Sequence, residues 1–397
     1  MTTPDIVTSF IHFTKNPQGQ GYLHVVAKRT YHLADGKIPE VAPRQIAVVR
    51  EPVFESDENS PVVWDPDFTG CGRTGTDVIV QGSAICRDGP RTEIEVSVSV
   101  EMGKDKRGDA EKYVRRMRVF GDRKVSWYQG SIYFTGPEPF EKMPITYARA
   151  YGGKDQSANK RHPNAFAKGL ANLADRPDDD FSPYEYPRNN LGQGYVVFPD
   201  REALDGLVLP NLEWVGDELT PERLVLGNHK RWPWAPRPAC FDFTHQDFFP
   251  RTAFLGISPE FEGEAETIPE VREGYLPASL LSVDFFEHLG SPEASRFFHA
   301  APANLVFPAF DGDEVIRIKN MHPTLPEVVA PTPAERPQML LEPHTGGTHE
   351  LEPALRTVVV RPDKEELIVI WIGTLAVDRP PTEAQYKKMR HAVRWRK

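Results

Sequence analysis

Residues 92–101 alternate apolar and polar side chains without interruption, and this run limits the possible folds more than any other stretch of the chain. A period of two places the isoleucine and the three valines on one face of a β-strand. Residues 112–120 follow a charged loop and predict a partner strand, with Met117 on its apolar face and Arg116 and Arg118 on the other. Opposite charges on facing strands stabilise antiparallel pairing, so we expect a sheet with an apolar underside and a charged, solvated face.

Proline is unusually frequent, with 38 residues among 397. It donates no hydrogen bond to a β-ladder and breaks helices, so short strands joined by stiff loops are expected. Residues 6–13 with 22–33 and residues 356–360 with 367–372 predict two hairpins, and the apolar last strand should be buried on both faces. The acidic, proline-punctuated residues 51–68 are expected to form a surface loop.

These patterns predict a mostly β fold, with antiparallel sheets forming a sandwich or an open-barrel-like core, long Pro-rich loops, a few short helices and a C-terminal helix. The helix is expected over residues 381–397, because Thr382 and Gln385 match a capping box and basic residues crowd the end of the segment. Before it we expect an N-terminal antiparallel β region (1–153), a charged, partly helical excursion (154–188) and a loop-rich β region ending in a buried hairpin (189–380). All four are expected to form one integrated domain.

Charge and cysteine content narrow the class of protein. The formal net charge of −10 disfavours non-specific binding to nucleic acid or to anionic lipid. Cys71, Cys86 and Cys240 are an odd number in a long chain, which favours a reducing compartment over a disulfide framework. The N-terminus lacks the basic and apolar regions of a signal peptide, and no apolar run is long enough to span a bilayer. We expect a cytoplasmic protein without membrane insertion.

Local patterns that suggest chemistry each have a simpler structural explanation. The glycine-containing residues 71–77 lack the Gly-Lys-Ser/Thr ending of a phosphate loop and lead into a strand, so a tight loop before a core strand is expected. The twelve histidines show no metal-ligand spacing, and His349-Glu-Leu-Glu lies in a Gly/Pro-rich loop. Cys240 has no partner in the sequence and is expected to be buried. The acids at 178–180 are expected to be solvated.

Aromatic and basic residues suggest possible partner surfaces. The apolar residues of a possible short helix, Phe166, Leu170 and Leu173, are candidates for partner binding. A second, aromatic set is either a sugar- or peptide-binding surface or, as we favour, a satellite core under long loops; it comprises Trp214, Trp232, Trp234, Phe241, Phe243, Phe248 and Phe249. Cross-strand pairing accounts for the basic residues of 112–124. For the basic residues of 387–397, partner binding stays open.

Residues 139–153 read Pro-Phe-Glu-Lys-Met-Pro-Ile-Thr-Tyr-Ala-Arg-Ala-Tyr-Gly-Gly. This segment resembles the signature Pro-Phe-x-x-Met-Pro-Leu-x-Tyr-Glu-Arg-Ala-Phe-Gly-Gly of the family called domain of unknown function 2169. Further segments match in order and cover nearly the whole chain. We expect the matched residues to be mainly structural; they are Gly75, Thr76, Asp77, Gly121, Asp122, Arg123, Pro139, Phe140, Met143, Pro144, Tyr147, Arg149, Gly152, Gly153, Gly192, Gly194, Pro210, Asn211, Phe297, Phe298, Ala301 and Pro302.

Three features depart from this pattern. Asn190 stands where the family usually has proline, Ala148 stands where it usually has glutamate, and residues 154–188 are longer than expected. The first two are compatible with the same backbone shape, and the third is a candidate insertion for a particular partner.

The resemblance implies a function that the residues alone do not specify. Members of the family are similar to chaperones or adaptors for effectors of the type VI secretion system, encoded beside the spike proteins VgrG and PAAR. This implies a cytoplasmic, non-enzymatic protein without metal or cofactor that binds an effector and helps load it onto the spike. Two alternatives are a hydrolase of carbohydrate or peptidoglycan using the acids at 178–180, and a carbohydrate-binding β-sandwich.

Overall fold

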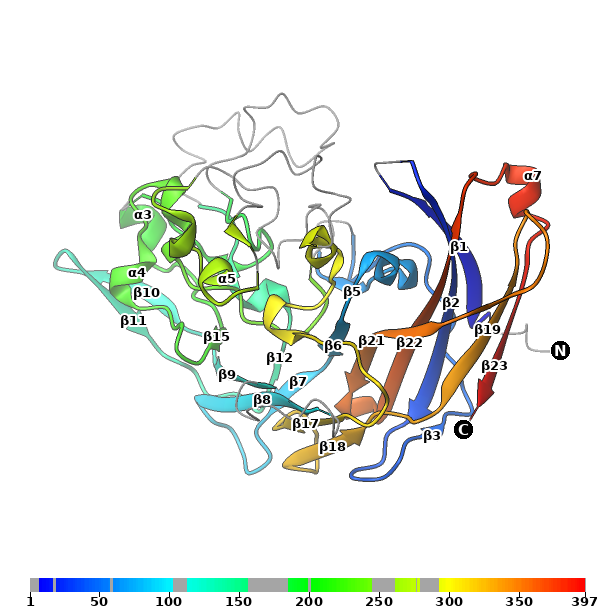
Figure 1. The fold of residues 1–397 in the computed structure, drawn as a ribbon. Helices are drawn as coiled ribbons and strands as arrows, with labels where there is room; N and C mark the ends of the chain where they lie inside the picture. Colours follow the sequence, from blue (N-terminus) through cyan, green and yellow to red (C-terminus); the bar gives the residue numbers. More distant parts are fainter. Residues whose placement is uncertain are drawn as a thin grey trace.

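The computed structural model describes residues 7–16, 19–57, 60–102, 113–155, 185–198, 201–244, 261–275, 277–278 and 293–396. Its largest sheet is built on two twelve-residue strands, β2 (Gly21–His32) and β22 (Glu366–Val377), which pair antiparallel along their whole length. Both expected hairpins are confirmed, because β1 (Ser9–Lys15) pairs with β2, and β21 (Pro353–Arg361) pairs with β22. An N-terminal hairpin and a hairpin from the C-terminal part of the chain therefore share one sheet (Figure 1).

The other strands of this sheet extend it on both sides. β6 (Thr76–Val80) runs parallel to β21, and β16 (Val306–Phe307) pairs with β6. The short β3 (Glu40–Val41) pairs with β2. The sheet thus combines segments from the start, the middle and the end of the sequence, and the mostly β fold expected from the sequence is confirmed.

A three-stranded sheet packs on one face of the large sheet, with strand order β20 (His349–Leu351), β19 (Arg336–Glu342), β23 (Arg390–Arg396) (Figure 1). The close approach depends on Gly373 of β22. A Cβ at this position would lie 2.8 Å from Cβ of Leu351 and 3.0 Å from Sδ of Met339. Any larger residue would therefore push the two sheets apart, because packed interiors leave no room for an added methyl group.

The alternating residues of the sequence form β8 (Glu93–Glu101), at the centre of a second large sheet. Its neighbours are β9 (Val114–Phe120), paired in turn with β15 (Leu212–Trp214), and β17 (Val315–Lys319), paired with β18 (Glu327–Pro331). The predicted charge pairing is confirmed, because Arg118 bonds Glu93 at 2.9 Å. Both side chains are exposed, so this pair contributes little to stability.

Short elements connect the sheets. The remaining strands form two-stranded pairs: β4 (Val53–Phe54) with β5 (Val62–Trp64), β7 (Ser83–Ile85) with β12 (Lys142–Pro144), β10 (Lys124–Tyr128) with β11 (Ser131–Thr135), and β13 (Tyr151–Gly152) with β14 (Gln193–Gly194). The described helices are all short: η1 (Asp67–Gly72), η4 (Tyr147–Arg149), α3 (Arg201–Leu204), α4 (Pro221–Leu224), η6 (His229–Trp234), η8 (Ala265–Thr267), α5 (Pro269–Arg272), η10 (Glu293–Phe298), η11 (Ala303–Leu305), η12 (Pro362–Lys364) and α7 (Glu383–Tyr386).

Buried apolar side chains form two clusters. The larger cluster is formed by buried side chains of the two large sheets and of the three-stranded sheet. The smaller one contains three buried tyrosines and Trp232 and lies under the helical, loop-rich part of the molecule that contains α3, α4 and α5 (Figure 1). The segment boundaries predicted at residues 153, 188 and 380 stay predictions. Within the described residues, no helix is both long enough and apolar enough to cross a membrane.

The predicted C-terminal helix is wrong. Its capping box is present, but α7 ends after one turn, at Tyr386, and residues 390–396 form strand β23 instead. The residues from Arg390 to Arg396 alternate exposed and half-buried side chains, a period of two that fits a strand. Pairing with β19 satisfies the backbone groups on one edge of this basic segment and turns Val393 and Trp395 towards the core.

The predicted surface loop at residues 51–68 is also wrong in part. This segment contains β4 and β5, and it buries Trp64 and Asp67. Asp67 accepts a hydrogen bond from the indole Nε1 of Trp64 at 2.9 Å and pairs with Nζ of Lys28 at 3.1 Å. An isolated buried charge is strongly unfavourable, so the acid and the lysine have to be buried together.

Candidate interaction site

Two segments of the family signature, far apart in the sequence, meet at the carboxylate of Asp77. Nδ1 of His299 lies 2.5 Å from this carboxylate, and the backbone N–H groups of Ala300 and Ala301 donate to it at 2.7 and 3.2 Å. The guanidinium of Arg73 lies 2.9 Å away. Burial raises the pKa of Asp77, but the charge of Arg73 and the hydrogen bonds outweigh it and hold the pKa at about 2. The carboxylate therefore ties β6 to the segment after η10.

Four further signature segments meet at one asparagine, Asn211. Its side-chain nitrogen donates to Asp122 at 3.0 Å and to the carbonyl of Phe120 at 3.2 Å. Its side-chain oxygen accepts from Arg149 at 3.0 Å and from Gln193 at 3.1 Å. An amide can donate and accept at once, so this single side chain cross-links four segments in a way that an aliphatic residue cannot.

The neighbouring signature residues brace the same junction. Arg123 is buried, donates to the carbonyl of Pro210 at 2.8 Å, pairs with Glu213 and stacks over the ring of Phe120. Gly121 packs directly against another backbone segment, because a Cβ there would lie 1.7 Å from a carbonyl oxygen. These residues specify how backbone segments pack against each other.

The other signature residues vary in exposure. The buried ones are Gly75, Thr76, Asp77, Gly121, Arg123, Met143, Tyr147, Gly152, Gly153, Gly194, Pro210, Asn211, Ala301 and Pro302. Phe140, Arg149, Gly192 and Phe298 are half-buried, and Asp122, Pro139 and Pro144 are exposed. The side chain of Phe297 lies outside the described residues.

The three tryptophans considered as candidates for partner binding have different surroundings. Trp214 is buried and donates from Nε1 to the carbonyl of Pro238 at 3.0 Å. Trp232 is buried beneath the guanidinium of Arg188, 4.7 Å from the ring centre. Only Trp234 is exposed, at 39 %. The predicted partner residues Phe166, Leu170 and Leu173 lie outside the described residues.

The residues considered for catalysis are not assembled into a reactive group in the described part of the chain. Cys240 is buried, and burial raises the pKa of its thiol well above the usual value, which disfavours the nucleophilic thiolate. Among the described residues, no group of three or more His, Cys, Asp or Glu side chains could hold a metal ion. The acids at 178–180, on which the hydrolase alternative depended, and the aromatic residues Phe248 and Phe249 lie outside the described residues.

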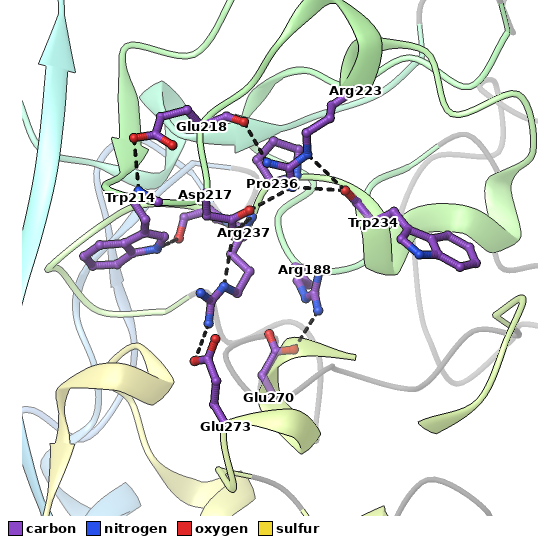
Figure 2. Close-up of polar contacts among 12 residues, drawn as sticks. Arg188, Trp214, Asp217, Glu218, Arg223, Trp234, Pro236, Arg237, Glu270 and Glu273 are labelled. Carbon is purple, nitrogen blue, oxygen red and sulfur yellow. Dashed lines mark hydrogen bonds and ion pairs between the residues drawn. The ribbon is translucent and has the colours of Figure 1, made fainter. Parts of the chain in front are cut away.

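The most extensive ionic network in the loop-rich part involves residues 261–275, which we call the acidic segment. It contains five glutamates and one arginine. Glu270 pairs with Arg188 at 2.6 Å, and Glu273 pairs with Arg237 at 2.8 Å (Figure 2). Arg231 and Arg296 also contact the segment, and we call these four arginines the arginine seat.

The pair between Arg188 and Glu270 is fully buried. Burial alone would lower the pKa of Arg188, but the carboxylate of Glu270 more than offsets this and raises it. The apolar side chains of Ile268 and Val271 dock the same segment on the smaller cluster. The acidic segment is therefore held like a bound amphipathic peptide, by carboxylates on arginines and by apolar residues on a core.

A cavity of about 40 Å³ lies at this junction, lined by residues of the seat, of the acidic segment and of the signature. Its walls include Arg188, Arg237 and Glu270, together with Asn304 and the signature residue Tyr147. Among the described residues, neither Nε of Arg188 nor Oδ1 of Asn304 has a hydrogen-bond partner. Within the described part of the chain, an unused donor of the seat and an unused acceptor of Asn304 therefore border the cavity.

The hairpin β10–β11 presents a second candidate surface, at the opposite end of the molecule from β23 (Figure 1). Its inner face packs Trp127 and Phe134 on the smaller cluster. Its outer face, which we call the tyrosine face, carries Tyr128 and Tyr133, exposed at 62 % and 53 %, next to two serines. Exposed tyrosines among small polar residues are typical of protein-binding surfaces.

Neither candidate surface was identified from the sequence. The arginine seat draws on three separate segments, so no local motif marks it. The five glutamates between Phe261 and Tyr275 were the one available signal. The tyrosine face is visible only once the register of the hairpin is known, because Tyr128 and Tyr133 alternate with inward-facing aromatic residues.

The family model described as "Uncharacterized protein conserved in bacteria (DUF2169)" matches residues 18–372. No curated protein and no solved structure matches this chain.

Proposed function

Because this chain belongs to the bacterial family DUF2169, we propose that it is a non-enzymatic chaperone or adaptor that binds a secreted effector of the type VI secretion system. It would act in the cytoplasm, shield apolar surface of the effector and help load the effector onto the VgrG or PAAR spike. The proposal applies to this chain the role that its resemblance to the family implies.

The tyrosine face is the observation that carries this proposal. Two large aromatic side chains, Tyr128 and Tyr133, lie more than half exposed on a hairpin whose other face packs against the smaller cluster. Exposing them to water is unfavourable, and burying them against a partner recovers that free energy. Because the strands fix their position, little conformational entropy is lost on binding.

The use made of the signature residues also supports a binding role. Asp77 and Asn211, the most highly connected of them, are engaged on all sides by other parts of the chain. Signature residues whose side chains join backbone segments fix the fold, and they do not themselves form a reactive or binding group. Members of such a family can differ in their exposed surfaces and keep the same fold.

Co-expression with the effector candidates encoded beside this gene tests the proposal. We expect the chain to co-purify with one of them and to raise its soluble yield. The double substitution Tyr128→Ser and Tyr133→Ser should weaken the complex at least about 30-fold, since a single buried aromatic hot spot contributes about 2 kcal/mol or more. Ile38→Ser with Val41→Ser is the matched control, because both residues are exposed apolar side chains elsewhere.

Two outcomes would contradict the proposal. If deletion of the gene leaves the solubility and secretion of every neighbouring effector unchanged, the chaperone role is wrong. If the tyrosine double variant and the control double variant bind the effector equally well, the tyrosine face is not the binding surface.

A further inference from the structure

We propose that the arginine seat is a binding site for an acidic amphipathic segment of a partner protein, and that residues 261–275 are its built-in occupant, which the partner's segment replaces. This inference rests on the proposed function only in taking the partner to be the protein that the chain binds. It goes further in two respects: it says that the recognised segment is acidic and amphipathic, and it says that residues 261–275 inhibit binding to the arginine seat.

The charge pattern of the acidic segment matches the seat. Glu262, Glu270 and Glu273 face arginines, with closest approaches of 3.7, 2.6 and 2.8 Å. Glu264 and Glu266 are exposed, and no ion pair involving them is found among the described residues. The three carboxylates that meet arginines and the buried side chain of Ile268 together make an amphipathic ligand that fits the arginine seat.

The seat is positioned by contacts that do not involve the acidic segment. Arg188 donates to the hydroxyl of Tyr186 at 3.1 Å and stacks on Trp232. Arg237 donates from Nε to Asp217 at 3.1 Å, and Figure 2 shows Arg237 reaching from Asp217 towards Glu273, with Arg188 pointing at Glu270. If the acidic segment leaves, these cations stay in place, so a second acidic segment meets a preorganised site.

The built-in occupant also fits incompletely. The cavity of about 40 Å³ at the junction, the free Nε of Arg188 and the free Oδ1 of Asn304 (free among the described residues) leave polar groups unsatisfied. Buried donors and acceptors without partners are unfavourable. A partner segment that adds a polar atom at this position would satisfy them, which gives it an advantage over residues 261–275.

Replacement of an intramolecular occupant obeys simple competition. The acidic segment is covalently attached, so its effective concentration is high and it masks the seat from a free peptide. A substitution that weakens the ionic contacts of the acidic segment should lower the fraction of molecules in which this segment masks the seat, and should raise the apparent affinity for a free peptide by the factor by which those contacts are weakened. The free peptide then binds more tightly, because the arginines lose no contact of their own when the attached glutamates are neutralised.

The test uses the full-length chain and a fluorescein-labelled synthetic peptide with the sequence of residues 261–275, with binding followed by fluorescence anisotropy. The double substitution Glu270→Gln and Glu273→Gln should raise the affinity for this peptide at least tenfold over wild type. The matched control, Glu264→Gln with Glu266→Gln, removes the same charge from the exposed side and should bind like wild type. Adding Arg237→Ala to the first variant should reverse the gain.

The inference is overturned if the folded Glu270→Gln, Glu273→Gln variant binds the peptide no more tightly than the control variant. Near-ultraviolet circular dichroism checks the fold. Should the double variant fail to fold, Glu273→Gln alone, whose ion pair with Arg237 is partly exposed, is expected to raise affinity about threefold, and an unchanged affinity then overturns the inference. The peptide assay contains no effector, so its failure is distinguishable from a failure of the proposed function.

Discussion

His24 lies in the interior of the largest sheet, at 2 % exposure, and makes the stability of the fold sensitive to acid. Its Nε2 lies 2.7 Å from the hydroxyl of Thr14, and its Nδ1 lies 2.9 Å from the hydroxyl of Thr374. Burial, together with the nearby charges of His12 and Arg356, lowers the pKa of His24 from 6.5 to about 3. Its side chain therefore stays neutral in the folded protein throughout the physiological pH range.

The sign of the effect follows from which state takes up the proton. As the pH falls below 6.5, the unfolded chain protonates at His24 and the folded chain does not, so the unfolded state gains stability. The difference in pKa corresponds to a loss of about 2 kcal/mol in the free energy of unfolding between about pH 7.5 and about pH 5, from His24 alone. The loss continues until the pH reaches the folded pKa of about 3.

Urea unfolding at the two pH values measures this loss, with His24→Asn as the perturbation. Asparagine keeps a polar side chain between the two threonines but does not titrate. The variant should show a pH-dependent loss that is smaller than that of wild type by about 2 kcal/mol. His349→Asn, at an exposed position on β20, is the control and should leave the pH dependence unchanged.

An equal loss of stability in wild type and in His24→Asn would refute this reasoning. It would mean that the histidine is solvated or protonated in the folded state, in conflict with its burial between two strands. Absolute stability does not decide the question, because the substitution also changes packing; only the difference between the two pH values does.

Other perturbations test the buried polar groups. Asp77→Asn should lower the free energy of unfolding by about 2–3 kcal/mol, because it removes the charged acceptor of Arg73, His299 and two backbone N–H groups, while Arg73 keeps its buried pair with Asp65 at 3.3 Å. Lys28→Met should lower the free energy of unfolding by about 3–5 kcal/mol, because it leaves the buried charge of Asp67 unpaired. Lys28→Met combined with Asp67→Leu should recover part of this loss, since no unpaired buried charge remains, but Nε1 of Trp64 and the N–H of Val49 lose their acceptor; a double variant as unstable as the single one would contradict this. Gly121→Ala should abolish soluble expression at 37 °C, because its methyl group would overlap a backbone carbonyl, and normal expression would show that the two segments can separate.

The sheet-forming stretches could be predicted because their information is local. The alternation in β8 and the opposite charges on β9 lie within thirty residues of each other, and the pairing of Arg118 with Glu93 follows directly. The long hairpin strands were predictable for the same reason. Which hairpins share a sheet was not, because the pairing of β2 with β22 joins segments more than 300 residues apart.

The errors arose where one local pattern fits two structures. Met389 and Val393 are spaced for one face of a helix, and His391, Val393 and Trp395 are spaced for one face of a strand. Pairing with β19 decides between them, and that partner is not visible in the local sequence. In the same way, acidic residues and prolines suggested an exposed loop at residues 51–68, but the distant Lys28 makes burial of Asp67 possible.

The arginine seat shows why the candidate site was harder to predict than the fold. Arg188, Arg237 and Arg296 are unremarkable in their own segments and become a site only when three loops meet around the acidic segment. Opposite charges on distant segments show no regular pattern in the sequence, so the spacing of the charged residues does not reveal which segments pair. A glutamate-rich stretch indicates only that cations are needed nearby.

The pairing of β2 with β22 also has a consequence for how the chain is made. Ribosomes release the N-terminal strands first, and the hairpin of β1 and β2 has to wait until more than 300 further residues have been synthesised before its main partner emerges. During that time both faces of β2, which is buried along almost its whole length in the folded protein, are uncovered in the nascent chain. We expect this protein to depend on general folding factors during its own synthesis, and a translational stop placed before residue 366 should yield an aggregating product.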